Sequence, residues 1–180
     1  MAKDCRDTAL SYLEHRARTA CEVKAHLLSK GFPEEETEEA LRYLQELGYL
    51  DDAGYCREYI RYGISKGRGP VRLQSELAEK GIDAALIREA LEEDFDRQAE
   101  KDSAMREAYK IIRPGRDIDV AFDGERASGP DGIKQADDQP GGRPDEKTVA
   151  KIGRKLSSLG YHTEVIYEVL GHFMQSREPD

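Results

Sequence analysis

A glycine-rich basic stretch has the clearest binding chemistry in this sequence. Residues 57–72 contain five basic residues and one acidic residue, a formal charge of +4. Gly67, Arg68 and Gly69 immediately precede Pro70, a residue that the first turn of a helix tolerates. Backbone amides at such a helix start, close to clustered cations, favour an anion. The stretch therefore predicts either a phosphate or carboxylate ligand, or a turn with solubilising charges.

The residue types that usually carry catalysis or bind metals form no recognisable pattern. The four histidines are scattered, and Cys21 and His26 are five residues apart, a spacing that does not present both side chains to one metal. Three cysteines without a Cys-x-x-Cys pair fit a reducing compartment. We expect Cys5, Cys21 and Cys56 to be small core residues. Neither an enzyme, a metal nor a cofactor is expected.

Acidic and basic residues alternate in blocks along the 180-residue chain, whose formal net charge is −9. Residues 33–53 contain eight acidic residues and one arginine, a formal charge of −7. A uniformly acidic protein would bind nucleic acid poorly, because phosphate contacts need clustered cations. The alternation predicts one face for a basic partner and another for an acidic partner, or simply solvated helix faces.

The apolar residues are too dispersed for a membrane-spanning helix. Hydrophobic residues make up 38% of the chain and charged residues 36%. No apolar run reaches the roughly 18 residues that a membrane helix needs. The first residues also lack the apolar segment of a signal peptide. We expect a cytoplasmic protein that does not bind membranes.

One unit recurs three times and defines the organisation of the chain. Each copy has a leucine four residues before a glycine, an apolar residue directly after it, and a second leucine ten residues beyond it. The three glycines are Gly31, Gly81 and Gly160. A glycine in the left-handed conformation commonly ends a helix, which places the first leucine in the last helical turn. The sequence therefore predicts an all-α fold of three tandem three-helix repeats in an elongated, curved array.

The predicted repeats occupy residues 1–50, residues 51–94, and residues 95–113 together with 145–176. Their first helices are expected over residues 4–16, 52–65 and 95–113. Thr19 and Glu22 form a capping box at the start of the second helix of the first repeat. Residues 114–144 contain six glycines and four prolines among 31 residues. This composition cannot bury enough apolar surface to offset ordering its backbone, which predicts a flexible insertion in the third repeat.

Several motifs, in the same order, resemble the RecX family of bacterial recombinase regulators. They are GYLDD at residues 48–52, KGRGP at residues 66–70 and LAEKGI at residues 77–82, with the Thr19 capping box. The resemblance is strong over residues 5–93 and weaker over residues 145–175. It implies a protein that binds the RecA recombinase filament on single-stranded DNA and lies in the filament groove. Such a protein limits filament growth, ATP hydrolysis, strand exchange and repressor cleavage.

The resemblance also implies which cations face the filament. Carried over onto matching positions, they are Arg16, Lys24, Arg61, Lys66, Arg68 and Arg72. Arg57 belongs to the same basic stretch, and Lys151, Arg154 and Lys155 are added for their charge and their place in the third repeat. Their role would be electrostatic docking to acidic protein surface or DNA phosphate. We expect a monomer whose direct binding to single-stranded or duplex DNA is weak, given its net charge.

Two other classes of function stay open. A tandem helix-turn-helix protein would also contain three-helix units with basic second helices, but Glu22, Lys24 and His26 form a mixed set. A generic helical-repeat scaffold is the third class, although the 50-residue spacing from Gly31 to Gly81 differs from the tetratricopeptide period of about 34 residues. Only the family resemblance separates the filament regulator from this scaffold.

Overall fold

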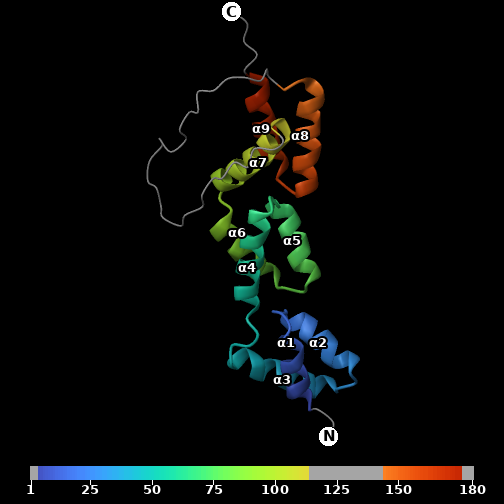
Figure 1. Cartoon of the computed structure of the whole chain (residues 1–180). Coiled ribbons are helices and arrows are strands. Elements are labelled where there is room, and N and C mark those ends of the chain that lie inside the picture. The colour runs from blue at the N-terminus through green and yellow to red at the C-terminus, as the bar shows by residue number, and fades with distance from the viewer. Residues whose placement is uncertain (1–3, 114–143, 176–180) are drawn as a thin grey trace, which may run out of the picture.

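The computed structural model describes residues 4–113 and 144–175, and every regular element in these ranges is an α-helix (Figure 1). The helices are α1 (Cys5–Leu13), α2 (Ala20–Ser29), α3 (Glu34–Glu46), α4 (Asp52–Ser65), α5 (Pro70–Glu79), α6 (Ala84–Asp94), α7 (Arg97–Ile112), α8 (Glu146–Leu159) and α9 (Thr163–Gln175). The all-α prediction is confirmed. The predicted insertion at residues 114–144 lies outside the described residues, except for Pro144.

Each successive trio of helices encloses its own hydrophobic core, and Figure 1 shows the trios following one another along an elongated molecule. In every pair of helices that packs extensively, both helices belong to the same trio. Leu27, Leu77 and Leu156, the leucines that precede the repeat glycines, are fully buried. The sequence repeat therefore corresponds to a structural repeat of three helices, as predicted.

The helix starts follow the capping signals in the sequence. The Thr19 hydroxyl accepts a hydrogen bond from the Glu22 amide, and the Glu22 carboxylate accepts one from the Thr19 amide, so the capping box is confirmed. Pro70 occupies the first turn of α5, also as expected. Helix α1 is shorter than predicted, because the chain turns after Leu13 to reach the capping box. Helix α7 starts two residues later than predicted, because Asp96 caps it.

The second helices of the third and second trios, α8 and α5, meet head to tail. The amides of Gly69 and Val71, at the start of α5, donate to the carbonyls of Leu159 and Gly160 at 2.8 and 3.0 Å. A helix leaves its first amides and last carbonyls without internal partners, and here each end satisfies the other. Gly160 has φ +84°, and a Cβ at this position would lie 2.4 Å from the Cβ of Arg72. The junction therefore requires glycine for its backbone conformation and for its space.

A second junction, through a side chain rather than backbone amides, joins α5 to α2. The Thr19 hydroxyl, at the start of α2, donates to the carbonyl of Lys80 at 2.8 Å. Gly81 has φ +74°, and a Cβ there would lie 2.4 Å from the Cys21 sulfur. The expected core position of Cys21 is wrong, because this residue lies in the first turn of α2 and is exposed, whereas the other two cysteines are buried as expected. Helices α8, α5 and α2 thus form one head-to-tail column.

A buried tyrosine strengthens the junction between the second and third trios. The Tyr161 hydroxyl donates to the carbonyl of Gly67 at 3.1 Å and accepts from the Ser103 hydroxyl at 2.9 Å. Burial raises the pKa of Tyr161 to about 12, so the phenol stays protonated and keeps its role as donor. Tyr161, the residue after the repeat glycine Gly160, therefore connects α7 and the start of α9 to the turn before α5.

We predict that alanine at the repeat glycines destabilises the protein unequally. Gly31 has φ +88° but open space around its Cβ position, so Gly31→Ala should cost about 1–2 kcal/mol from backbone strain alone. Gly160→Ala and Gly81→Ala add a clash with a neighbouring helix and should cost a further ~1–3 kcal/mol. The measurement is the free energy of unfolding in urea, followed by circular dichroism. Equal losses at the three positions would contradict the proposed role of the junctions.

Candidate partner-binding surface

Helix α8 presents one basic face to solvent. Its buried residues Ile152, Leu156 and Leu159 pack into the core of the third trio, which turns the opposite side outward. The exposed cations of this side, which we call the α8 face, are Lys147, Lys151, Arg154 and Lys155. None of the four forms an ion pair with any described residue. At 1.5 Å per residue, the face spans about 12 Å along the helix.

The predicted cations of the first trio are held by carboxylates. The Lys24 ammonium lies 3.1 Å from Glu34 and 3.2 Å from Glu38. Hydrogen bonds to these two carboxylates raise the pKa of Lys24. Arg16 pairs with Glu22 at 3.0 Å, and the hydrogen bond to Glu22 likewise raises the pKa of Arg16. Both cations are partly neutralised within the protein, so their attraction for an external anion is weaker than that of a free cation.

Two predicted arginines of the second trio share one carboxylate. Arg68 and Arg72 pair with the two oxygens of Glu76 at 3.0 and 2.8 Å, and the Tyr59 hydroxyl donates to Glu76 at 2.9 Å. Burial acts to raise the pKa of Glu76, but hydrogen bonds from Arg72 and Tyr59 outweigh it, so the pKa is lowered. This cluster holds the start of α5, where the junction with α8 lies.

The other predicted cations of the second trio are less constrained. Arg61 is exposed and lies 3.6 Å from Asp94. The Lys66 ammonium lies 5.4 Å from the ring centroid of Tyr62, an exposed tyrosine of the same helix. Arg57 is half-buried, with no ion pair to a residue that the structure describes. These side chains extend along α4 and its C-terminal turn, separate from α8.

The glycine-rich stretch before α5 is an internal junction. Gly67, Gly69 and Pro70 are buried, and the amides of Gly69 and Val71 already donate to carbonyls at the end of α8. The prediction of an anion at these amides is therefore wrong. The sequence indicated that these amides are donors. It did not indicate their acceptors, the carbonyls of Leu159 and Gly160, because these are distant in sequence and lie close to the amides only in the folded protein.

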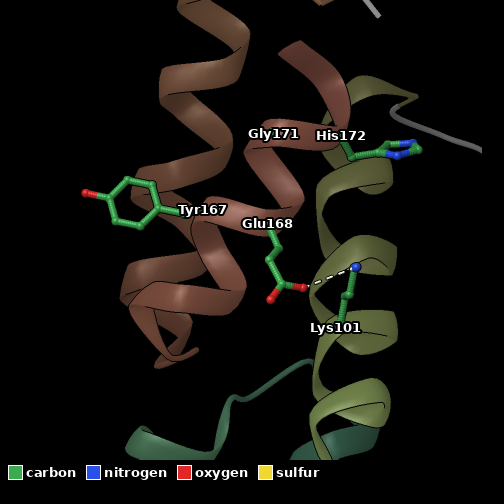
Figure 2. A pocket seen from close by; sticks show the side chains of 5 residues that line it. All are labelled: Lys101, Tyr167, Glu168, Gly171 and His172. Atoms are coloured by element: carbon green, nitrogen blue, oxygen red, sulfur yellow. Dashed lines mark ion pairs between the residues drawn. The ribbon is translucent and has the colours of Figure 1, made fainter. Parts of the chain in front are cut away.

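A shallow hollow between α7 and α9 is lined by Lys101, Tyr167, Glu168, Gly171 and His172. In Figure 2, Glu168 extends from α9 towards Lys101 on α7, while the Tyr167 and His172 side chains point away from this pair. Glu168 accepts hydrogen bonds from Arg97 and from Lys101, and these lower its pKa. The hollow therefore contains an ion pair that joins two helices, rather than an arrangement suited to nucleophilic or acid–base chemistry.

The described residues contain no cluster of three or more His, Cys, Asp or Glu side chains placed to hold a metal ion. Across residues 4–113 and 144–175, no helix combines the length and apolar character needed to cross a membrane.

The α8 face is consequently the strongest candidate for partner binding, and its first member, Lys147, was missed in the sequence. The four-residue spacing from Lys147 to Lys151 and to Lys155 could have revealed it.

The architecture defines a tandem three-helix repeat protein. Residues 5–44 match the sequence model of the first three-helix domain of RecX, and residues 51–91 match that of the second. These two matches, together with relatives named Regulatory protein RecX, support membership of the RecX family. The two matched segments coincide with the first two trios of helices.

Curated relatives are similar over part of their length. The Regulatory protein RecX of Legionella pneumophila is 39% identical over 90 residues, which cover 50% of this chain and 60% of that protein. The protein of the same name from Bacillus licheniformis is 37% identical over 106 residues, covering 58% of this chain and 40% of that protein. The chain thus spans about half the length of these relatives.

Solved structures are similar over most of the chain. The crystal structure of RecX from Lactobacillus salivarius has a TM-score of 0.70 at 20% identity and covers 95% of each chain. A second crystal structure, of regulatory protein RecX, has a TM-score of 0.67 at 23% identity and covers 92% of this chain and 70% of the other. At these identities the similarity shows the fold, and it extends through the third trio.

We predict that the Glu76 cluster makes stability depend on pH. Because the folded-state pKa of Glu76 lies below its ordinary value of 4.5, its contribution is complete above that value and is lost as the pH falls through the folded pKa. Glu76→Gln should therefore be less stable than the wild type at pH 7, and the difference should shrink at acidic pH. Urea unfolding at both pH values measures this difference.

The control for this experiment is Glu79→Gln. Glu79 lies in the same helix, is exposed, and forms no ion pair with the described residues. A glutamine there should change stability little at either pH. A Glu76→Gln difference that stays constant between neutral and acidic pH would show that the arginine cluster does not stabilise the fold through the Glu76 charge.

Proposed function

We propose that this chain regulates a RecA recombinase by binding its filament on single-stranded DNA. It lies in the filament groove and inhibits filament growth, ATP hydrolysis, strand exchange and repressor cleavage. Membership of the RecX family and the name Regulatory protein RecX of its relatives support a regulatory role. We infer that the chain acts by binding and not as an enzyme, since relatives of this name are described as regulators.

The unpaired α8 face is the observation that carries this proposal. Lys147, Lys151, Arg154 and Lys155 are exposed in a protein whose net charge is −9, so they form a local site of opposite sign. Clustered cations of this kind steer a protein towards acidic protein surface or DNA phosphate. Helix α8 would then make the principal electrostatic contact with the filament.

The elongated shape supports a contact with several filament subunits. The three trios follow one another along the molecule, and head-to-tail junctions at Gly160 and Gly81 join them. Weak contacts from several repeats combine into tighter binding when they engage together. Arg57, Arg61 and Lys66 on the second trio would add a separate set of contacts to those of the α8 face. Arg16, Lys24, Arg68 and Arg72 would contribute less, because carboxylates of the protein already hold them.

The experiment is a titration of the chain into RecA from the same organism on single-stranded DNA. The rate of ATP hydrolysis is measured at amounts of the chain below those of RecA. We expect inhibition at these low amounts, because blocking filament growth at one point affects many subunits. An unchanged rate, together with tight binding of the chain to bare duplex DNA, would contradict the proposal and favour a helix-turn-helix protein.

We predict that Lys151→Ala combined with Lys155→Ala weakens this inhibition. Exposed charge contacts contribute up to about 1 kcal/mol each, so the half-inhibitory concentration should rise about tenfold. If the two lysines contact phosphate, binding of the variant should also depend less on salt. The slope of log affinity against log salt concentration should become shallower by about 1.4.

The matched control is Arg42→Ala combined with Arg88→Ala. Both arginines are exposed on other helices and form no ion pair with a described residue, so the control removes the same charge from a different surface. It should leave the half-inhibitory concentration near that of the wild type. Equal effects of the two double variants would show that net charge matters and the α8 face does not.

A further inference from the structure

The junction between the second and third trios is made largely by backbone atoms. The amides of Gly69 and Val71 donate to backbone carbonyls at the end of α8, and the buried Tyr161 hydroxyl donates to the carbonyl of Gly67. A Cβ at Gly69 would lie 2.4 Å from the backbone of Gly160. Hydrogen bonds are directional, and a bond between two backbone groups contains no side-chain torsion that could turn. This junction therefore holds the two trios in one relative orientation.

The junction between the first and second trios is made through side chains. The Thr19 hydroxyl donates to the carbonyl of Lys80 at 2.8 Å. The amide of Ala20, the first residue of α2, donates to the carboxylate of Asp52, the first residue of α4, at 2.9 Å. Each bond includes at least one side-chain torsion, which has several staggered positions. Both bonds can therefore persist while the angle between the two trios changes.

An open cleft beside this junction gives the first trio room to move. The cleft has a volume of about 570 Å³ and is lined from both trios, by Cys21, Glu22 and Ala25 of α2 and by Tyr59, Glu76, Glu79 and Lys80 of the second trio. Closely packed interiors leave few voids larger than a water molecule. The cleft therefore allows α2 to tilt relative to α5 without displacing packed side chains.

The covalent connection between these trios is short and little packed (Figure 1). Leu47 and Tyr49, in the segment between α3 and α4, are 53% and 60% exposed. Leu50 is buried in the core of the first trio, and α4 begins at Asp52, so the exposed Asp51 alone connects the two bodies. Hinges commonly consist of a few such residues at the ends of helices, which absorb the change in backbone torsion.

We propose that the first trio is a hinged arm, which swings about Asp51 and the α5–α2 junction while the second and third trios move as one rigid body. The side-chain bonds of Thr19 and Asp52 are the pivots, and the cleft widens or narrows with the angle. This inference goes beyond the proposed filament binding and does not depend on it. If the chain binds a filament, the second and third trios would dock together and the arm would adjust to the neighbouring subunit.

Distances between pairs of spin labels on the full chain, measured by electron paramagnetic resonance without RecA or DNA, test this proposal. Labels at Arg42→Cys and Arg88→Cys span the first junction, and labels at Arg88→Cys and Ala150→Cys span the second; all three positions are exposed. Cys21→Ser removes the exposed native thiol. The distance distribution across the first junction should be about twice as broad as that across the second. Equal widths would overturn the proposal.

Asp52→Ala tests the pivot itself, because it removes the acceptor of the Ala20 amide. It should broaden the distribution across the first junction further and leave the second unchanged, whereas Asp52→Asn keeps an acceptor oxygen and should resemble the wild type. Circular dichroism checks that each variant keeps its helices. An Asp52→Ala distribution as narrow as that of the wild type would contradict the assigned pivot. Because RecA is absent, these failures would leave the filament proposal standing, and unchanged ATP hydrolysis by RecA would leave the hinge standing.

Discussion

The structure depends on one constraint, the close approach of a helix-ending glycine to the first turn of a helix in the neighbouring trio. Gly160, after α8, approaches α5, and Gly81, after α5, approaches α2. At Gly160 and Gly81 the neighbouring residues would lie 2.4 Å from any added Cβ, and the backbone is left-handed at both positions. The extensively packed helix pairs all lie within trios, so these small contacts set how one trio follows the next. They join α8, α5 and α2 into one column and hold the α8 face at one end of it.

The distribution of paired and unpaired cations follows from this arrangement. Several cations in the first two trios form ion pairs with carboxylates of the protein, as Lys24 does with Glu34 and Glu38, and as Arg72 does with Glu76. These clusters stabilise helix packing but leave little charge for a partner. The cations of α8 form no ion pair with a described residue, so an acidic chain has its clearest positive surface on the third trio.

The fold could be predicted from the sequence because its signals are local and repeated. Leu27, Leu77 and Leu156 mark helix ends in the same frame, and the Thr19 capping box lies within one turn. The site could be predicted only in part. The spacing of Lys151 and Lys155 marks a helix face, but the partners of Lys24 and of the amides before α5 lie on other elements. Such pairings depend on tertiary geometry, which no local pattern contains.

Chemical labelling of lysines on the RecA–DNA filament would test the central claim, that the α8 face docks an acidic partner. The chain would be acetylated with and without filament and analysed by mass spectrometry, residue by residue. The account predicts that the filament protects Lys147, Lys151 and Lys155 strongly and leaves Lys101, which pairs with Glu168 on another face, labelled as before. Equal labelling of the three α8 lysines with and without bound filament would contradict it.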